Sequence, residues 1–336
     1  MRSRIDLKTW IGIIISLFFL FLLFRKIDVH QLATALRSAD YRYIALAVLF
    51  TFASYFLRAV RWRYLLIAEK EIPLSSLFPA TIIGYMANNL LPARLGEFVR
   101  AYTLARREQL ATPAVFASLV IDRLFDGFTV LLLLVTTLFT LHLPAGMEDA
   151  ATALKTGGIV MFALYCGVLL FLFVLKRQTI KTLAMVGFLL KPFPASVGGK
   201  VIPLLGSFIG GIRLSSRGGH VGAMLASSVA IWLFCILPVD MVLRAFNIHL
   251  PMMASVFILI LLVFAVMVPA SPGFIGTYHY ACYKGLSVFG IAENTSVSIA
   301  LVIHGTAFFP VIVAGFYYLW KNKVSLHELQ GATQAQ

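Results

Sequence analysis

Charged and amide side chains gather at one point of the chain where a helix must break. Residues 88–100 read Asn-Asn-Leu-Leu-Pro-Ala-Arg-Leu-Gly-Glu-Phe-Val-Arg and follow an apolar stretch. Pro92 and Gly96 interrupt the helical hydrogen bonds, and the backbone groups released there need a partner from protein, water or ligand. If a helix begins after Gly96, its first amide groups and its positive dipole end face the break. This arrangement favours binding of a phosphate or a carboxylate.

The side chains at this break suit the same ligand. Arg94 and Arg100 carry planar guanidiniums that match phosphate oxygens, and Asn89 adds an amide. Glu97 has three interpretations: it pairs with one of these arginines and only holds the structure, it neutralises an arginine while no anion is bound, or it contacts a cationic head group. We predict that the substrate-binding residues here are Asn89, Arg94, Glu97 and Arg100, supported by Pro92 and Gly96.

A second charged group begins a long apolar run at residues 122–126, which read Asp-Arg-Leu-Phe-Asp. Asp122 and Asp126 are four residues apart and share one helical face, with Arg123 in reach of Asp126. An acidic pair of this kind can hold a divalent metal or relay protons. We favour a buried ion-pair network that supports the site, and we predict no metal. The candidate arginine partners are Arg58, Arg61, Arg94 and Arg100.

A second break repeats the Pro-Ala-x-x-Gly pattern of the first at residues 269–280, which read Pro-Ala-Ser-Pro-Gly-Phe-Ile-Gly-Thr-Tyr-His-Tyr. Its polar groups are mostly uncharged. We predict that Ser271, Gly273 and His279 form the opposite wall of the substrate site. The supporting residues would be Pro269, Pro272, Gly276 and His304. His279 and His304 lie deep in apolar surroundings, where they either pack through hydrogen bonds or titrate and couple transport to protons.

The composition identifies the elements that position these groups as membrane helices. The chain has 336 residues, of which 60% are hydrophobic and 12% charged, whereas soluble domains are about 45–50% apolar and about 25% charged. Apolar runs recur at about the ~20 residues that a membrane-spanning helix needs. The clear spans are 10–24, 43–60, 115–141, 157–175, 221–243 and 295–319. No hydrophilic stretch can bury a core of its own, so the membrane part must carry the function.

Two further apolar stretches, 74–91 and 252–268, end at the two proline breaks. We interpret 74–108 and 252–290 as re-entrant hairpins that enter from opposite faces, an inverted-repeat-like arrangement typical of carriers. The fold class is thus an all-α polytopic membrane protein with about six full transmembrane helices plus two opposed re-entrant helical hairpins. Both termini would be cytoplasmic. Cysteine labelling that places Arg106 and Lys284 on one side of the membrane would contradict this topology.

The charge distribution agrees with this topology and defines the domain organisation. In it, 20 of the 28 lysines and arginines lie on the cytoplasmic side, as the positive-inside rule expects. The formal charge of +14 therefore indicates topology and no nucleic-acid partner. We expect one integral membrane domain, 1–336, whose parts are a first half 1–175, a basic linker 176–220, a second half 221–320 and a cytoplasmic tail 321–336. The linker is either an amphipathic segment on the anionic leaflet or an ordinary positive loop.

At both breaks and at the acidic group the chain resembles the flippase-like family of the transmembrane region of lysylphosphatidylglycerol synthase. The matching segments are 89–97 with Arg100, 122–126 and 269–276, and the resemblance spans about residues 10–320. It implies translocation of a lipid between membrane leaflets. The family often has Glu at the positions of Asp122 and His279. Because the carboxylate at His279 is lost here, lysyl-phosphatidylglycerol is one candidate, and a phosphate-bearing lipid agrees better with Arg94 and Arg100.

We therefore expect a lipid flippase or transporter for an anionic, phosphate-bearing lipid or a polyprenyl-linked lipid, in a bacterial or archaeal cytoplasmic (inner) membrane. Its partners would be membrane lipids with anionic head groups. No nucleotide or dinucleotide fingerprint is present, so we expect no cofactor and no catalysis. Two alternatives remain. One is a non-catalytic scaffold for a lipid or glycan biosynthesis enzyme, and the other is a membrane-embedded, metal-dependent lipid-phosphate transferase.

Overall fold

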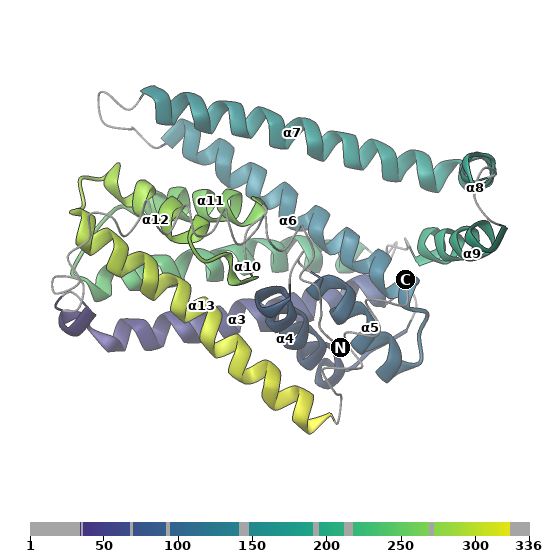
Figure 1. Ribbon diagram of the computed structural model, residues 1–336, viewed down its shortest axis with the longest axis horizontal. Coiled ribbons are helices and arrows are strands. Elements are labelled where there is room, and N and C mark those ends of the chain that lie inside the picture. The colour runs from purple at the N-terminus through teal and green to yellow at the C-terminus, as the bar shows by residue number, and fades with distance from the viewer. Residues whose placement is uncertain are drawn as a thin grey trace, which may run out of the picture.

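The computed structural model describes residues 34, 36–67, 70–91, 95–140, 148–190, 195–211, 218–268 and 272–322. Within these residues every regular element is a helix (Figure 1). The long helices are α3 (Tyr41–Leu66), α6 (Thr112–Thr140), α7 (Glu148–Arg177), α10 (Gly218–Ala245) and α13 (Glu293–Lys321). The shorter elements are α4 (Leu74–Leu90), α5 (Gly96–Glu108), α8 (Thr179–Leu189), α9 (Ala195–Gly211), α11 (Met252–Met267), the 3-10 turn η2 (Pro272–Phe274) and α12 (Thr277–Ser287).

Three of the described helices are long and apolar enough to cross a membrane, namely α3, α10 and α13. Shorter apolar stretches occur in α7, α8, α9 and α11. The chain is accordingly a polytopic helical membrane protein. The expected first span, 10–24, lies outside the described residues, and the number of crossings stays a prediction.

Both expected proline breaks are present, and the backbone shows their cause. A residue before proline is pushed out of the helical region into an extended conformation. Leu91, which precedes Pro92, ends α4 with ψ 144°, and Val268, which precedes Pro269, ends α11 with ψ 130°. The chain then turns and resumes as α5 after the first break and as α12 after the second.

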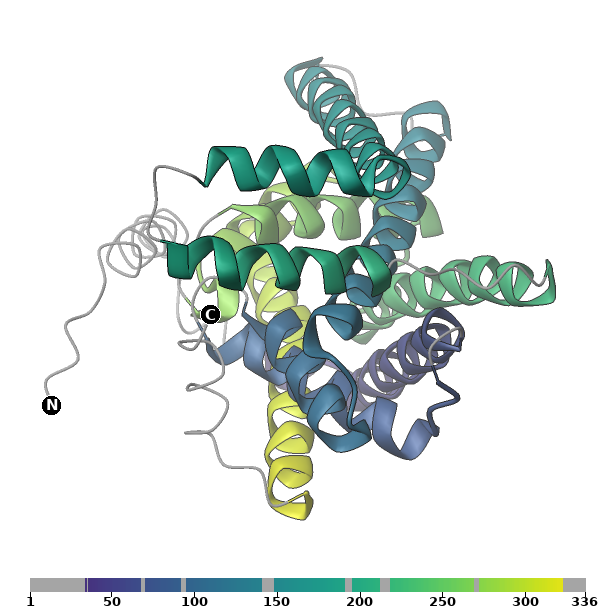
Figure 2. The same cartoon turned by 90° about the vertical axis from the view of Figure 1, so that its right-hand side faces the viewer.

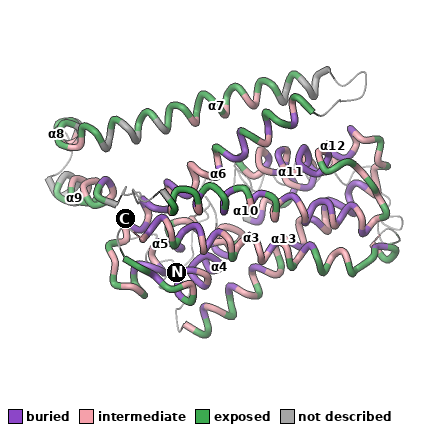
Figure 3. The backbone as a smooth tube through the Cα atoms, turned by 180° about the vertical axis from the view of Figure 1, so that it is seen from behind, coloured by how far each residue is buried: buried purple, intermediate pink, exposed green. Residues whose placement is uncertain are grey.

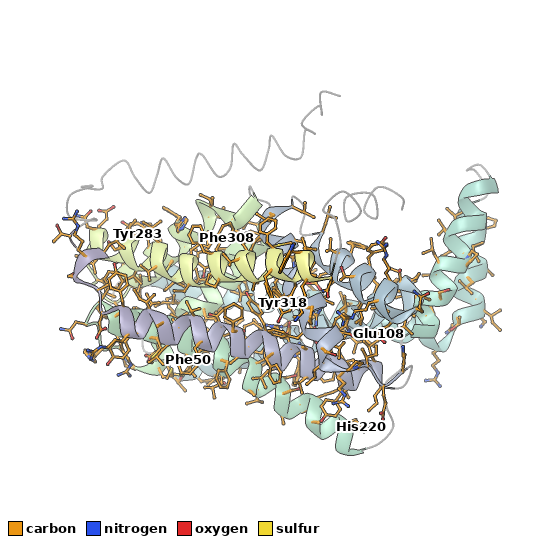
Figure 4. All side chains as sticks on the ribbon, turned by 90° about the horizontal axis from the view of Figure 1, so that it is seen from below. Phe50, Glu108, His220, Tyr283, Phe308 and Tyr318 are labelled. Atoms are coloured by element: carbon orange, nitrogen blue, oxygen red, sulfur yellow. The ribbon has the colours of Figure 1, made fainter. Side chains whose placement is uncertain are left out.

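Each break is the tip of a helical hairpin, because α4 packs on α5 and α11 packs on α12. The two tips meet: a Cβ added to Gly273 in η2 would lie 3.7 Å from the backbone carbonyl oxygen of Asn89 at the end of α4. Glu108, at the open end of the first hairpin, and Tyr283, in α12 of the second, lie toward opposite ends of the molecule (Figure 4). The hairpins are therefore opposed. Their insertion into a membrane as re-entrant elements stays a prediction.

The order long helix, hairpin, long helix occurs twice, as α3, α4–α5, α6 and as α10, α11–α12, α13. The first helices of the two halves run antiparallel along their length. Asp40 donates its backbone N–H to the Ala245 carbonyl oxygen at 2.8 Å, and at the other end the rings of Tyr64 and His220 are 5.8 Å apart. The final helix of each half packs on the hairpin of the other, α13 on α4 and α6 on α11. The halves thus interlock with opposite orientations.

The segment that joins the halves is largely helical where it is described. Helix α7 runs along one side and is exposed over much of its length (Figure 3). Helices α8 and α9 lie side by side at one end of the molecule (Figure 2), and α9 also packs against α6. The side chains of Lys191, Arg213 and Arg217 lie outside the described residues, so the expected amphipathic character of the linker stays untested.

Candidate functional site

The first hairpin is built around a very close crossing of α4 and α5. A Cβ on Gly96, the first residue of α5, would lie 2.1 Å from the carbonyl oxygen of Gly84, and one on Gly84 would lie 2.6 Å from Cβ of Arg100. Asn88 caps the new helix, because its Oδ1 accepts the Gly96 N–H at 2.8 Å. Helix α5 begins at this glycine, so its amino end lies at the break. The crossing fixes Glu97 and Arg100 in the first turn and a half of α5.

A buried ion-pair network joins α3, α6 and α10 next to this hairpin. Arg61 donates from Nε to Asp122 Oδ1 and from Nη2 to Asp126 Oδ1, both at 2.7 Å, and from Nη1 to Ser228 Oγ at 3.0 Å. Arg58 donates to Asp126 Oδ2 at 2.6 Å. Arg61 and Asp122 are completely buried. Both aspartates are thus engaged by arginines, which is the arrangement favoured from the sequence over a metal site.

Arg100 enters the same network from α5 but leaves donors unused. Its Nη1 donates to Asp122 Oδ2 at 3.2 Å, and its guanidinium carbon lies 4.1 Å from the centre of the Trp62 ring, within range of a cation–π contact. The side chain is 1% exposed. Its Nε and Nη2 have no hydrogen-bond partner among the described residues. Buried donors without partners are costly, so an acceptor bound to these two N–H groups would be stabilising.

Arg123 is the most accessible guanidinium of the network. It donates to Asp126 Oδ2 at 2.9 Å, the expected i, i+3 contact, and to Glu97 Oε1 and the Tyr85 hydroxyl. Its side chain is 39% exposed and that of Glu97 is 23% exposed. The second carboxylate oxygen of Glu97, Oε2, has no partner among the described residues. Glu97 therefore pairs with Arg123, while Arg100 pairs with Asp122.

The network carries an excess of positive charge. Within the described part of the chain its members are Arg58, Arg61, Arg100 and Arg123 against Glu97, Asp122 and Asp126. Four guanidiniums face three carboxylates. In a poorly hydrated interior, an uncompensated charge is stabilised by a partner of opposite sign. The arrangement is therefore suited to accept one anion.

An apolar groove lies between α5, α6 and α9. It has a volume of about 280 Å³ and is lined by Phe98, Thr112, Pro113, Phe116, Val201, Leu204, Leu205 and Phe208. Phe98, the residue after Glu97, stacks on Phe116 with ring centres 4.5 Å apart. Phe116 and Arg123 share one face of α6 because they are seven residues, or about two helical turns, apart. The groove therefore lies on the same face of α6 as the accessible guanidinium.

The second hairpin carries an uncharged polar group at its tip. His279 Nε2 on α12 and His304 Nδ1 on α13 are 2.9 Å apart, and His279 Nδ1 accepts the Gly276 N–H at 3.3 Å. The tip backbone has unusual conformations, with φ of 78° at Gly273, 57° at Phe274 and 97° at Gly276. Glycine at the first and third of these positions avoids the strain that a side chain would bring.

The structure brings most of the predicted site residues into two groups. Glu97, Arg100, Asp122, Arg123 and Asp126 belong to the ion-pair network, and Gly273, Gly276, His279 and His304 belong to the second tip. The tips of the two hairpins meet where Gly273 lies near Asn89. Pro92, Arg94, Pro269 and Ser271 lie outside the described residues. Pro272 begins the turn η2.

Two residues of α4 were absent from the predicted site. Asn88 caps α5 and also contacts Glu97 Oε1 at 3.4 Å, and Tyr85 accepts from Arg123 at 3.2 Å. Both lie on one helical face, three residues apart, which is the signal that would have found them.

At the open end of this hairpin, a hydrogen bond from Lys70 at 2.8 Å lowers the pKa of the Glu108 carboxyl.

Comparison with known proteins places these features in a family. The profile of the lysylphosphatidylglycerol synthase TM region matches residues 9–315. Glycosyltransferase AglD of Haloferax volcanii is 33% identical over 160 residues, which are 46% of this chain and only 26% of AglD. UPF0104 membrane proteins match over more of their length. The one from Methanothermobacter thermautotrophicus is 26% identical over 85% of this chain and 87% of its own.

A second UPF0104 membrane protein, from Methanocaldococcus jannaschii, is 20% identical over 96% of this chain and 98% of its own length. No solved structure matches the chain. The family profile covers both hairpins, the ion-pair network and all but the end of α13. The chain therefore belongs to the family of the lysylphosphatidylglycerol synthase transmembrane region.

Proposed function

We propose that this protein is a transporter that moves an anionic, phosphate-bearing lipid or a polyprenyl-linked lipid between the two leaflets of a membrane. The observation that carries the proposal is the ion-pair network at the first hairpin. It holds four guanidiniums against three carboxylates, and Arg100 has two buried N–H donors without a partner among the described residues. Guanidiniums are well suited to phosphate oxygens.

The network suggests an order of contacts for the head group. Arg123 is exposed enough to meet the anion first, while Arg100 lies deeper and would be reached when the hairpin moves. Glu97 occupies Arg123 in the absence of lipid and would be displaced as the phosphate binds. The sequence adds Arg94, between Pro92 and Gly96. In this scheme Asp122 and Asp126 hold the other arginines in place and do not contact the lipid.

The apolar groove supports a substrate with a hydrocarbon chain. Its lining is almost entirely apolar, and its residue Phe116 lies on the same face of α6 as Arg123. A lipid whose chain lies against Phe98 and Phe116 would present its head group to the charged residues. The two opposed hairpins support alternating access, because carriers built from inverted repeats bind substrate at the repeat interface near the membrane midplane.

The alternatives differ in what supports them. A metal-dependent transferase would need free carboxylates, but Asp122 and Asp126 are both bonded to arginines. The similarity to part of a glycosyltransferase favours a second candidate, a non-catalytic membrane unit that works with a lipid or glycan synthase. The proposed location is the cytoplasmic membrane of a bacterium or archaeon.

Mass spectrometry of co-purifying lipids tests the proposal. We would compare the wild type, Arg123→Gln and an Arg94→Ala, Arg100→Ala double variant in mild detergent. Arg106→Gln is the matched control, because Arg106 lies exposed on the same helix as Arg100. We expect one class of phosphate lipid to be enriched on the wild type and the control and lost from the other two. Equal lipid profiles on all four proteins would contradict a head-group site and favour the scaffold.

A further inference from the structure

The second hairpin is fastened to α13 by a pair of histidines. His279 comes from α12 and His304 from α13, and their facing nitrogens are 2.9 Å apart. Each histidine also holds the tip backbone, since His279 accepts the Gly276 N–H and His304 has a hydrogen bond with the backbone of Gly273. The pair therefore closes the tip and joins it to the last long helix.

The hydrogen-bond pattern fixes where the protons lie. A backbone N–H can only donate, so His279 Nδ1 must be the unprotonated acceptor toward Gly276. The neutral ring of His279 then carries its proton on Nε2 and donates it to His304 Nδ1. His304 in turn carries its proton on Nε2, and this ring also has the hydrogen bond with the Gly273 backbone. The result is a one-way chain of donors, from Gly276 through His279 to His304, with both rings neutral.

One added proton cannot be accommodated in this chain. The two acceptor nitrogens are His279 Nδ1 and His304 Nδ1, and each already faces an N–H group. If His279 Nδ1 is protonated, its N–H faces the N–H of Gly276. If His304 Nδ1 is protonated, its N–H faces the N–H on His279 Nε2. Either event breaks one of the two hydrogen bonds and places a cation in apolar surroundings.

No carboxylate contacts the pair among the described residues. On α12 the nearby titratable groups are Tyr278, whose ring lies 4.8 Å from that of His304, and Cys282. Helix α11 has no titratable residue. The remaining helices near Tyr278 contribute Cys235 of α10 and Tyr55 of α3. On α4, which packs on α13, the only titratable residue is Tyr85, which accepts from Arg123. A protonated pair would therefore lack a counter-ion in the closed arrangement.

Among the described residues of the first half, no such histidine pair joins the hairpin to the following long helix. There the same two elements, the second helix of the hairpin and the following long helix, are joined by the ion pairs Glu97–Arg123 and Arg100–Asp122. Each of these contacts joins a positively charged guanidinium to a negatively charged carboxylate, in contrast to the pair of uncharged imidazoles. Only the contact in the second half is made of two side chains whose type takes up protons between about pH 5 and 8.

We propose that the His279–His304 pair is a proton-binding site that releases the second hairpin from α13. In the neutral state the pair holds the tip against the end of α4, where Gly273 meets Asn89. Uptake of one proton breaks a hydrogen bond at the tip and opens this contact between the halves. The proposal does not depend on the identity of the lipid, because it concerns the movement of the hairpin alone.

A native cysteine reports the opening. Cys282 follows His279 by about one turn on α12 and is fully buried, whereas Cys166 on α7 is exposed. The purified wild-type protein in lipid nanodiscs would be labelled with a pyridyl disulfide, which reacts with thiols in acid as well as at neutral pH. Peptide mass spectrometry then gives the labelling ratio of Cys282 to Cys166 from about pH 8 to about pH 5. The ratio corrects for the chemistry of the thiol reaction.

We expect the ratio to rise as the pH falls, by up to about tenfold per pH unit if one proton is taken up on opening. The rise should vanish in His279→Gln and in His304→Gln, whether the glutamine keeps the contact closed or leaves it open. It should persist in His220→Gln, which changes a histidine near the start of α10. A flat ratio in the wild type, or a rise that survives in both glutamine variants, would overturn the proposal. Neither result bears on lipid co-purification.

Discussion

Asp122 is the residue on which the buried network most depends. Its two carboxylate oxygens accept from Arg61 and from Arg100, and its backbone carbonyl also accepts from Arg61. Removing one partner of a buried ion pair leaves an uncompensated charge, which costs far more than the loss of a solvated contact. A substitution at Asp122 therefore tests how much the buried ion pairs contribute to stability, in comparison with ion pairs at the surface.

We predict that Asp122→Asn lowers stability by about 3–5 kcal/mol, as expected for a broken buried pair. The matched control is Glu108→Gln, which breaks the more exposed contact with Lys70 and should cost about 1 kcal/mol or less. Thermal unfolding of both variants in one detergent, followed by size-exclusion chromatography, measures the difference. Similar unfolding temperatures for the two would show that the network contributes little.

At the residue scale, the sequence predicts which charged residues need a partner because they lie in apolar segments, but it does not predict every ion pair that they form. Charges within apolar runs identified Asp122, Asp126 and their candidate partners, and the i, i+3 spacing predicted the contact of Arg123 with Asp126. The bond of Glu97 to Arg123 joins residues 26 positions apart and depends on how α5 packs on α6. No local pattern contains that information.

At the element scale, the crossing of α4 and α5 depends on the absence of side chains at two glycines. Membrane helices gain little from the hydrophobic effect on association, so close backbone approach contributes much of their packing. A Cβ on Gly96 would overlap the Gly84 carbonyl oxygen at 2.1 Å. Because the contacted atom belongs to the backbone of α4, the overlap can be relieved only if the amino end of α5 moves away from α4.

We predict that Gly96→Ala severely reduces the yield of monodisperse protein. Gly167→Ala is the control, since Gly167 lies in α7 and its added Cβ would meet nothing within 4 Å. That substitution should be neutral or stabilise by about 0.5–1 kcal/mol, because glycine is a poor helix former. Fluorescence-detected size-exclusion chromatography compares the two. A normal profile for Gly96→Ala would mean that the crossing is looser than described.

The elements themselves were partly predictable. The proline rule gave both helix ends, at Leu90 and Met267, and the repeated Pro-Ala-x-x-Gly pattern indicated two similar turns. The helical character of residues 179–189 and 195–211 did not follow, because positive charge and apolar residues there fitted a loop as well as a helix. Helix α9 packs on α6, and a contact between segments so far apart in the sequence cannot be predicted from hydropathy.

At the scale of the whole molecule, the two halves share an order of elements but differ in chemistry. The hairpin of the first half is joined to the next long helix by ion pairs, and that of the second half by the His279–His304 pair. In the proposed mechanism the first hairpin binds the head group and the second controls access. Opposed hairpins that meet at their tips let a change in one half reach the other through a short contact.

Lipid translocation in reconstituted vesicles tests the central claim most directly. Proteoliposomes would contain a fluorescent short-chain phosphate lipid, and a membrane-impermeant reductant would quench the label in the outer leaflet. The account predicts that the wild type and Arg106→Gln make the inner-leaflet lipid accessible, while Arg123→Gln, purified to the same monodispersity, does so much more slowly. Quenching that stops at the outer leaflet in wild-type vesicles, as it does in protein-free vesicles, would contradict the account.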